Sequence, residues 1–275
     1  MSVENECTHD CSSCGENCSE RKGPPDFSAK LNASSRVGKV VAVASGKGGV
    51  GKSLVAALLA SAAAKRGLRA AVLDADITGP SIPKAFGITG GTLGSEKGIL
   101  PSVSAGGVRV MSLNLLVDNP SEPVVWRGPV ITGAAKQFWT DVFWDDIDVM
   151  FVDMPPGTGD VPLTVFQSLP VDGVVVVASP QELVGMIVEK SVRMAAMMDK
   201  KVLGLVENMS YLECPDCGRR IEVFGPSRAD ELAERHGIPV VCRLPINPEY
   251  ASAVDKGRVE TIDCAALAPL IDAIV

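Results

Sequence analysis

Eight consecutive residues near position 50 have the residue types and spacing of a phosphate-binding loop. They match G-x-x-x-x-G-K-[ST] in full, and they are Gly46, Lys47, Gly48, Gly49, Val50, Gly51, Lys52 and Ser53. The glycines let backbone N–H groups surround phosphate oxygens, and a following helix N-terminus adds a favourable dipole. Lys52 would bring positive charge to the β- and γ-phosphates, and Ser53 would offer Mg²⁺ a hydroxyl ligand. The stretch predicts a nucleoside triphosphate site.

Acidic residues after apolar runs are candidates for holding the metal and orienting the attacking water. Asp153 follows a run of four apolar residues, and Asp74 and Asp76 end another apolar run. Because ligand sites of open parallel sheets lie at the carboxyl ends of strands, these positions suit such a site. Each aspartate could instead be a helix cap or a turn residue, which is common where strands end.

A pair of closely spaced cysteines could bind metal. Cys214 and Cys217 form C-P-D-C, a spacing that suits two ligands of one centre. Two thiolates are too few for a four-cysteine site. If the chain forms a two-fold dimer, two pairs give four thiolates, and one [4Fe–4S] cluster could bridge the subunits. Zinc accepts the same ligands, and spacing alone favours it. Cys242 and Cys264 lie in apolar segments and are expected to be core thiols.

A second group of thiols lies near the N-terminus with the spacing C-x3-C-x2-C-x3-C, formed by Cys7, Cys11, Cys14 and Cys18. A straight helix would spread them over about 16 Å, so the segment must fold around any metal that it binds. The spacing departs from that of the ferredoxins. We expect a second iron–sulfur site here, with zinc or a transient cysteine relay as the alternatives. His9, a lone histidine in this polar segment, is expected to be solvated.

Strands and helices that could position these groups alternate along the chain from about residue 37. Apolar runs rich in valine predict buried strands at 40–44, 70–73, 108–113, 149–152, 174–178, 202–206 and 240–244. Helices are predicted at 54–65, 131–143, 183–198 and 227–236, with a short one at the C-terminus. The alternation predicts a doubly wound α/β fold, with a mostly parallel sheet and helices on both faces. Residues 211–224, which contain the C-P-D-C pair, interrupt it.

The first 36 residues differ from the rest of the chain. They are polar, lack apolar periodicity and include Gly-Pro-Pro. This predicts a flexible cysteine-rich tail and linker at residues 1–36, followed by one P-loop domain at 37–275. A length of 275 residues suits a single large α/β domain with such a tail.

Composition and charge exclude several classes of protein. With 46% hydrophobic and 21% charged residues, the chain as a whole is not disordered. The net charge of −7 disfavours a nucleic-acid partner. The longest apolar stretch, residues 54–64, is too short to span a membrane, and the polar N-terminus is not a secretory signal. We expect a cytoplasmic protein with reduced thiols and neither a nucleic-acid nor a membrane partner.

Several motifs together resemble a known family. Lys47 is the additional lysine of the deviant Walker A group, which includes MinD, ParA and the nitrogenase iron protein. Within that group, the chain resembles the Mrp/ApbC iron–sulfur cluster carriers from about residue 37 to the C-terminus. Five further motifs occur in order, namely LDAD with GPS at 73–81, WRGP at 126–129, DMPPGTGD at 153–160, ENMS at 207–210 and CPDC at 214–217.

The resemblance implies roles for particular residues. Lys47 would reach across a homodimer to the partner's nucleotide, Asp76 would position the hydrolytic water, and Asp153 would hold Mg²⁺ through water. Asn208 would hydrogen-bond the adenine, although a capping or turn role fits its position equally. The implied activity is slow ATP hydrolysis coupled to binding a [4Fe–4S] cluster and transferring it to apoproteins. The resemblance also favours a cluster over zinc at the C-P-D-C pair.

Two other functions occur in the same group. A positioning ATPase of the ParA/MinD kind would bind DNA or membrane. The net charge disfavours DNA, and residues 265–275 contain no Lys or Arg to face anionic lipid. An electron-transfer ATPase resembling the nitrogenase iron protein would also bridge a cluster between subunits. The C-P-D-C spacing and the N-terminal thiols favour the carrier over this reductase.

Overall fold

A computed structural model describes residues 28–76, 81–116, 128–157, 159–183 and 186–275. The strands of its main sheet are β1 (Arg36–Ala44), β2 (Ala70–Asp74), β5 (Ser102–Val103), β6 (Arg109–Met111), β7 (Asp146–Asp153), β8 (Gly173–Ala178), β9 (Lys201–Glu213), β10 (Arg220–Ile221) and β11 (Val241–Pro245). A separate small hairpin pairs β3 (Gly94–Ser95) with β4 (Gly98–Ile99).

The main sheet has the order β10-β9-β8-β1-β7-β2-β6-β5, and β11 also pairs with β9. The pairs formed by β1 with β7 and β8, by β2 with β6 and β7, and by β9 with β8 and β11 are parallel. The two end pairs, β5 with β6 and β9 with β10, are antiparallel. The carboxyl ends of β1, β2 and β7 therefore lie at the same edge of the sheet. The phosphate loop follows β1 there, and the candidate acidic residues lie at the ends of β2 and β7.

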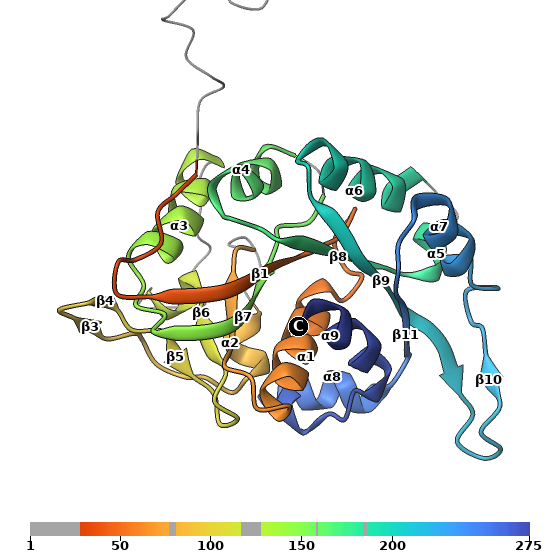
Figure 1. Cartoon of the computed structure of the whole chain (residues 1–275). Helices are drawn as coiled ribbons and strands as arrows, with labels where there is room; N and C mark the ends of the chain where they lie inside the picture. Colours follow the sequence, from red (N-terminus) through yellow and green to blue (C-terminus); the bar gives the residue numbers. More distant parts are fainter. Residues whose placement is uncertain (1–27, 77–80, 117–127, 158, 184–185) are drawn as a thin grey trace, which may run out of the picture.

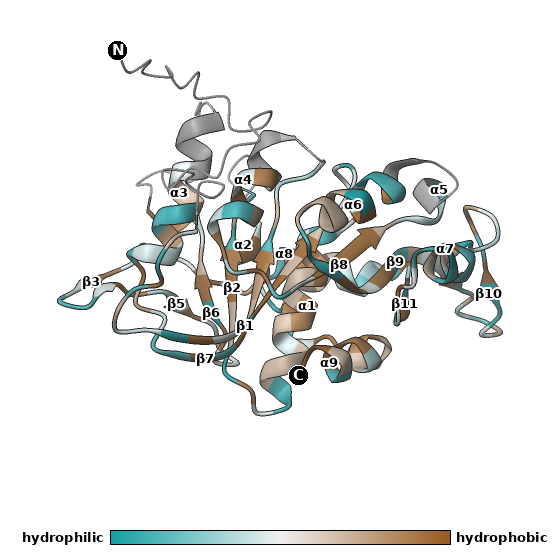
Figure 2. Ribbon diagram, turned by 45° about the horizontal axis from the view of Figure 1, so that its top comes forward, coloured by the Kyte–Doolittle hydropathy of each residue, from teal (hydrophilic) through white to brown (hydrophobic). Residues whose placement is uncertain are grey.

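Helices cover both faces of this sheet (Figure 1). They are α1 (Lys52–Lys65), α2 (Ile82–Ala85), α3 (Gly128–Thr140), α4 (Asp160–Ser168), α5 (Pro180–Leu183), α6 (Met186–Met197), α7 (Ala229–His236), α8 (Pro248–Asp255) and α9 (Ala268–Ile274). Helices α3, α4, α6 and α7 pack on one face, and α1, α2 and α9 pack on the other. Side chains of β1 alternate between the two resulting cores, with Val40 and Ala42 in the first and Val41 and Val43 in the second. Figure 2 shows the hydrophobic residues concentrated on the central strands.

The observed architecture confirms the predicted doubly wound α/β fold, but some elements have other bounds. The strand predicted at 202–206 continues to Glu213, and β6 is shorter than predicted. Of the helix predicted at 183–198, residues 186–197 form α6, and Leu183 is the last residue of α5. Helix α8 is absent from the prediction although its start has clear signals. Asn247 caps it by accepting the N–H of Glu249, and Pro248 occupies the first turn.

Residues 28–35, which the sequence places in the linker, contact the domain. The N–H of Ala29 donates to the carbonyl of Ser168 at 2.8 Å, and Trp139 Nε1 donates to the carbonyl of Ala29 at 3.1 Å. Leu31 packs against the core. This part of the predicted linker is thus held on α3 and α4, and the division at residue 36 stays a prediction.

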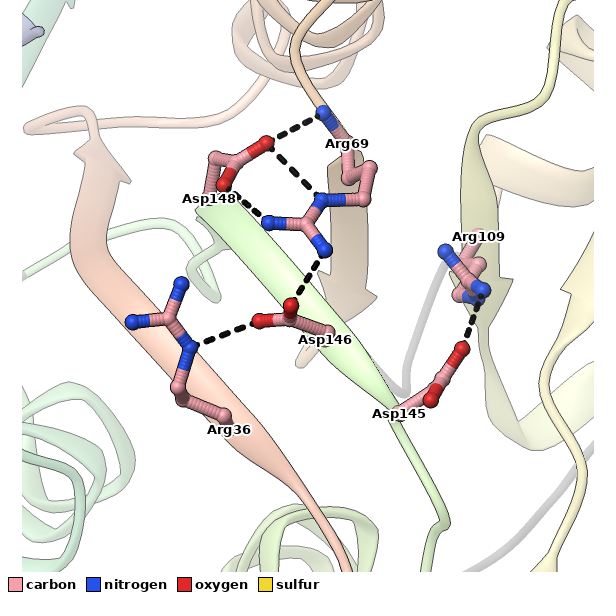
Figure 3. A network of polar contacts seen from close by, with 6 residues as sticks. All are labelled: Arg36, Arg69, Arg109, Asp145, Asp146 and Asp148. Atoms are coloured by element: carbon pink, nitrogen blue, oxygen red, sulfur yellow. Dashed lines mark hydrogen bonds and ion pairs between the residues drawn. The ribbon is translucent and has the colours of Figure 1, made fainter.

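Ion pairs connect neighbouring strands at the amino end of β7, opposite the candidate site (Figure 3). Arg69 Nη2 lies 2.6 Å from Asp148 Oδ1, and its other terminal nitrogen pairs with Asp146. Asp146 also accepts from Arg36 Nε at 2.7 Å. Hydrogen bonds from Arg69 hold the pKa of Asp148 at about 2, and hydrogen bonds from Arg36 and Arg69 lower the pKa of Asp146. The network therefore stabilises the fold at pH values above the ordinary aspartate pKa. This contribution is lost as the pH falls from about 4 toward 2.

We expect Arg69→Gln to lower the melting temperature at neutral pH by roughly 1–3 °C, since these groups are solvent-accessible. The difference from the wild type should shrink below about pH 4, where the carboxylates of the wild type become protonated. Thermal unfolding followed by circular dichroism between pH 7 and pH 3 measures both values. Arg193→Gln, which removes a single surface pair with Glu189, is the control and should cause a smaller loss. A difference that stays constant with pH would contradict the assignment.

Candidate functional site: a phosphate loop and a thiol hairpin

The loop between β1 and α1 has the backbone geometry that a phosphate site needs. Gly49 and Gly51 both have a φ of 84°, in the left-handed region that favours glycine. Gly51 is the N-cap of α1 and supplies no side-chain cap, which leaves the first N–H groups of α1 available to an anion. A Cβ added at Gly48 or Gly49 would meet no atom within 4 Å, so there is open space beside the loop.

The structure brings the predicted lysine and aspartates together. Lys52 is 6% exposed, and its Nζ lies 2.6 Å from Asp153 Oδ1 and 3.4 Å from Asp76 Oδ2. The same Nζ is 3.5 Å from Ser53 Oγ. The pairing register places Asp153 beside both Val43 and Asp74, so three neighbouring strands deliver this cluster. The positions agree with the sequence-based expectation, and the individual roles stay predictions.

Asp153 has the surroundings of a group that helps to hold a cation. It is fully buried, and its Oδ2 has no hydrogen-bond partner within the described parts of the chain. Burial raises the pKa of Asp153, and the charge of Lys52 opposes the rise. A buried carboxylate oxygen without a partner is costly unless a ligand satisfies it. With the hydroxyl of Ser53 nearby, the donor set fits Mg²⁺, which prefers oxygen ligands and keeps several of its waters.

The structure separates two aspartates that their positions after the apolar run leave equivalent, and of which the family resemblance selects Asp76. Asp76 is partly exposed and faces Lys52. Asp74 is buried, and its carboxylate accepts from Ser112 Oγ at 3.0 Å and from the N–H of Asp76 at 3.2 Å. Burial and the nearby charge of Asp153 raise the pKa of Asp74 well above its ordinary value. Asp74 thus supports the turn that presents Asp76, and Ser112, which sequence reasoning did not select, supports Asp74.

Asp74→Asn should stabilise the free protein at neutral pH. A raised folded-state pKa means that the native state binds more protons than the unfolded state, so ionisation of Asp74 opposes folding as pH rises above the ordinary aspartate range. We expect a gain of roughly 2–6 °C in melting temperature at pH 7, which disappears near pH 4. Asp76→Asn is the matched control and should give no such gain. Equal melting temperatures for Asp74→Asn and wild type at pH 7 would contradict this account of Asp74.

Asn208 lies directly against the phosphate loop. It is 3% exposed, and its Nδ2 donates to the carbonyl of Val50 at 2.9 Å. A Cβ at Gly51 would come within 2.2 Å of the same nitrogen, which is a second reason for glycine there. The sequence did not predict this contact, because it joins residues 158 positions apart. The predicted bond from Asn208 to adenine stays a prediction.

Lys47 occupies a different environment from Lys52. Lys47 is exposed on the loop, whereas Lys52 is buried beside carboxylates. Its backbone is held by Ser45, whose Oγ donates to the Lys47 carbonyl at 2.9 Å. The predicted reach of Lys47 to the nucleotide of a partner chain stays a prediction.

The C-P-D-C pair forms the turn of a hairpin at the edge of the sheet. The last residues of β9 pair with β10, with Glu213 opposite Arg220. The N–H of Cys214 donates to the carbonyl of Arg219 at 3.0 Å, and the N–H of Gly218 donates to the carbonyl of Cys214 at 2.9 Å. Cys217 is exposed and Cys214 is partly exposed.

This turn favours the thiolate form of one cysteine. Backbone N–H groups of Cys217 and Asp216 lower the pKa of the Cys214 thiol. A thiolate is the form that binds metal. Within the described residues, no group of three or more candidate metal ligands occurs, so the hairpin presents two thiols as a unit. The C-P-D-C spacing is compatible with either an iron–sulfur cluster or zinc.

The remaining cysteines divide into two groups. Cys242 and Cys264 are buried in the core below α9, and burial raises the pKa of both thiols, that of Cys264 to about 11, which confirms them as core residues. The N-terminal candidates lie outside the described residues, as does the lone histidine among them, and these are Cys7, His9, Cys11, Cys14 and Cys18. Within the described ranges, none of the helices has the length and hydropathy of a membrane span.

A parallel α/β sheet with a glycine-rich loop between β1 and α1, and with acidic residues at the ends of β2 and β7, defines a P-loop NTPase. A family profile described as the NUBPL iron-transfer P-loop NTPase, of the ParA group, matches residues 36–273. The chain therefore belongs to the NUBPL-type iron-transfer P-loop NTPases.

Named relatives agree with this assignment. The iron-sulfur cluster carrier protein of Clostridium perfringens is 41% identical over 91% of this chain and 93% of its own length. The protein of the same name from Methanocaldococcus jannaschii is 38% identical over 95% and 92%. A nucleotide-binding protein from Archaeoglobus fulgidus, solved in complex with ADP, is 42% identical with a TM-score of 0.77, over 84% of this chain and 91% of its own. The cell division ATPase MinD of Pyrococcus furiosus is 17% identical, covers 86% of this chain and 97% of its own, and with a TM-score of 0.58 shares the fold.

Proposed function

We propose that this protein is an iron–sulfur cluster carrier that binds and hydrolyses ATP and transfers a [4Fe–4S] cluster to apoproteins. The observation that carries the proposal is the layout of β9. One residue of this strand, Asn208, contacts the phosphate loop, and the same strand ends in the hairpin with Cys214 and Cys217. A nucleotide site and a pair of metal-binding thiols thus share one element. The names of the relatives support the same activity.

On the nucleotide side, the proposed mechanism begins with an exchange of partners at Lys52. In the free protein, Lys52 is paired with Asp153 and Asp76. Phosphate oxygens of ATP would take over the ammonium group, which frees both carboxylates. Asp76 would then orient the attacking water, and Ser53 with Asp153 would hold Mg²⁺. When bound, Mg²⁺ neutralises the charge that develops on the β- and γ-phosphate oxygens.

On the cluster side, the cargo would be held between two copies of the chain. Two hairpins related by a two-fold axis supply four thiolates, the number that a [4Fe–4S] cluster requires. Lys47 of each copy would reach the nucleotide of the other, and Asn208 would hydrogen-bond the adenine. ATP binding would then change the dimer interface and the hold on the cluster. Hydrolysis coupled to such rearrangement would be slow.

Other parts of the proposal concern the tail and the setting. The N-terminal thiols would form a second iron–sulfur site on a tail at residues 1–36, in front of the ATPase domain at 37–275. The carrier would act in the cytoplasm, where thiols stay reduced, with apo iron–sulfur proteins as its clients and neither nucleic acid nor membrane as a partner.

The direct test is cluster transfer to an apo-ferredoxin under anaerobic conditions. Wild type loaded with cluster should transfer it at clearly different rates with and without Mg–ATP, and Lys52→Ala should lose this dependence. Recovery of the ferredoxin absorbance follows the transfer. Equal rates with and without Mg–ATP in both proteins would refute ATP-dependent transfer. Co-sedimentation of wild type with liposomes or duplex DNA would favour a positioning ATPase instead.

A further inference from the structure

The stretch of β9 between Asn208 and the hairpin contains an unfavourable backbone conformation. Met209 has a φ of 58°, in the left-handed region, where side chains other than glycine, asparagine and aspartate are uncommon. The residue lies inside a strand, between the contact with the phosphate loop and the first thiol. Strain of this kind persists only where the surroundings enforce it, and it concentrates at functional sites.

Side chains before and after Met209 are hydrogen-bonded to each other across it. Ser210 Oγ donates to Glu207 Oε2 at 2.5 Å, so a side-chain hydrogen bond spans the strained residue. Glu207 is completely buried, and its other oxygen, Oε1, has no hydrogen-bond partner among the described residues. A buried carboxylate that is only half satisfied is costly and calls for a specific reason.

The neighbouring strand β11 also contacts Glu207. Arg243 of β11 lies opposite Glu207 in the register, and its Nε is 3.4 Å from Glu207 Oε2. The pairing of β11 with β9 becomes irregular immediately beyond, between Arg243 and Pro245. The guanidinium also reaches Asp230 at the start of α7, at 2.6 Å. Four features therefore coincide within a few residues of β9. They are the positive φ of Met209, the hydrogen bond from Ser210 to Glu207, the buried Glu207 and the irregular pairing with β11.

We propose that Met209, held by the Glu207–Ser210 hydrogen bond, is a joint that positions the thiol hairpin relative to the phosphate loop and transmits nucleotide binding to it. The inference rests on the proposed function and adds the residues that connect its two sites. On one side of the joint, Asn208 Nδ2 donates to the carbonyl of Val50 in the phosphate loop. On the other, β9 continues to Cys214 and pairs with β10. Glu207, Met209 and Ser210 are positioning residues, since they touch neither nucleotide nor cluster in this account.

Two variants test the joint in the full-length protein. Met209→Gly accepts the same φ without strain and so keeps the fold, but it makes the joint flexible. Ser210→Ala removes the bond that spans Met209 and leaves the remaining groups in place. Ser227→Ala is the matched control. The hydroxyl of Ser227 lies 3.4 Å from Nε of the same Arg243, but Ser227 is not part of β9. Hydrogen exchange of the amides at 211–222, measured with and without Mg–ADP, reports on the hairpin without requiring a cluster.

In wild type and Ser227→Ala, Mg–ADP should change exchange in the hairpin by at least about threefold. Met209→Gly and Ser210→Ala should lose most of this change, while calorimetry gives a dissociation constant for Mg–ADP within about threefold of wild type. The proposed joint would be refuted if Mg–ADP changed hairpin exchange in both variants as much as in wild type, or if it caused no change in wild type. The proposed function is judged separately by cluster transfer, because equal transfer rates with and without Mg–ATP would refute ATP-dependent transfer even where the hairpin responds to Mg–ADP.

Discussion

Lys52→Ala should abolish measurable ATP hydrolysis, with a loss of at least about 10²–10³-fold, and should also destabilise the free protein. The first effect follows from removing the charge that would meet the developing charge on the phosphates. The second follows from the pairs with Asp153 and Asp76. Removing one partner of a buried ion pair leaves an uncompensated charge and costs about 3–5 kcal/mol. Phosphate release measures the first effect, and urea unfolding without nucleotide measures the second.

The other lysine of the loop is the matched control for this prediction. Lys47 is exposed, so Lys47→Ala should leave the free energy of unfolding close to that of wild type. If Lys47 acts on the nucleotide of a partner chain, the same variant should still lose hydrolysis. Comparing the two variants separates the catalytic contribution of a lysine from its contribution to the fold. Wild-type stability for Lys52→Ala would mean that the carboxylates do not depend on this lysine.

Cys214→Ala/Cys217→Ala should reduce cluster transfer to background, more than about tenfold below wild type, without loss of stability. A cluster shared by two hairpins contributes two iron atoms per chain, and a tail cluster would contribute four. Iron should therefore fall from about six to about four atoms per chain if the tail holds its own [4Fe–4S] cluster. Anaerobic purification followed by iron, sulfide and zinc analysis provides these values.

The buried cysteines give the control for the hairpin variant. Cys242→Ala/Cys264→Ala should keep the wild-type iron content and transfer rate but lose about 1–3 kcal/mol of stability, because two core side chains are shortened. Zinc in the wild-type hairpin, with no iron after oxygen-free handling, would contradict the cluster assignment. It would leave the P-loop assignment intact, since that depends on other residues.

The parts of the site predicted from sequence are those determined by local patterns. The phosphate loop is a contiguous motif between an apolar strand and an apolar helix, so both its position and its geometry could be expected. Asp153 and Asp76 could be expected at the same edge because parallel strands bring their carboxyl ends together. The C-P-D-C pair is likewise local, and a turn with two thiols follows from its spacing.

Other features depend on contacts between distant residues and could not be predicted in this way. Nothing local distinguishes Asp74 from Asp76, because their difference comes from Ser112 and from depth in the fold. The contact of Asn208 with Val50 is similarly distant. Strand β9 extends beyond its prediction because β11 and β10 pair with its polar second half, where the sequence shows no apolar run. Nothing at Met209 itself indicates its unusual backbone.

Because each hairpin offers only two thiols, cluster binding would depend on the concentration of the protein. Half of a coordination sphere cannot retain cargo alone, so under the shared-cluster proposal loading would be second order in chain, and occupancy would follow mass action. Dilution would favour release, and a client offering all four ligands on one molecule would compete with a complex that can come apart. The cluster would then move from a site shared by two chains to a site on a single client molecule. The client would not need to bind more tightly at each individual sulfur.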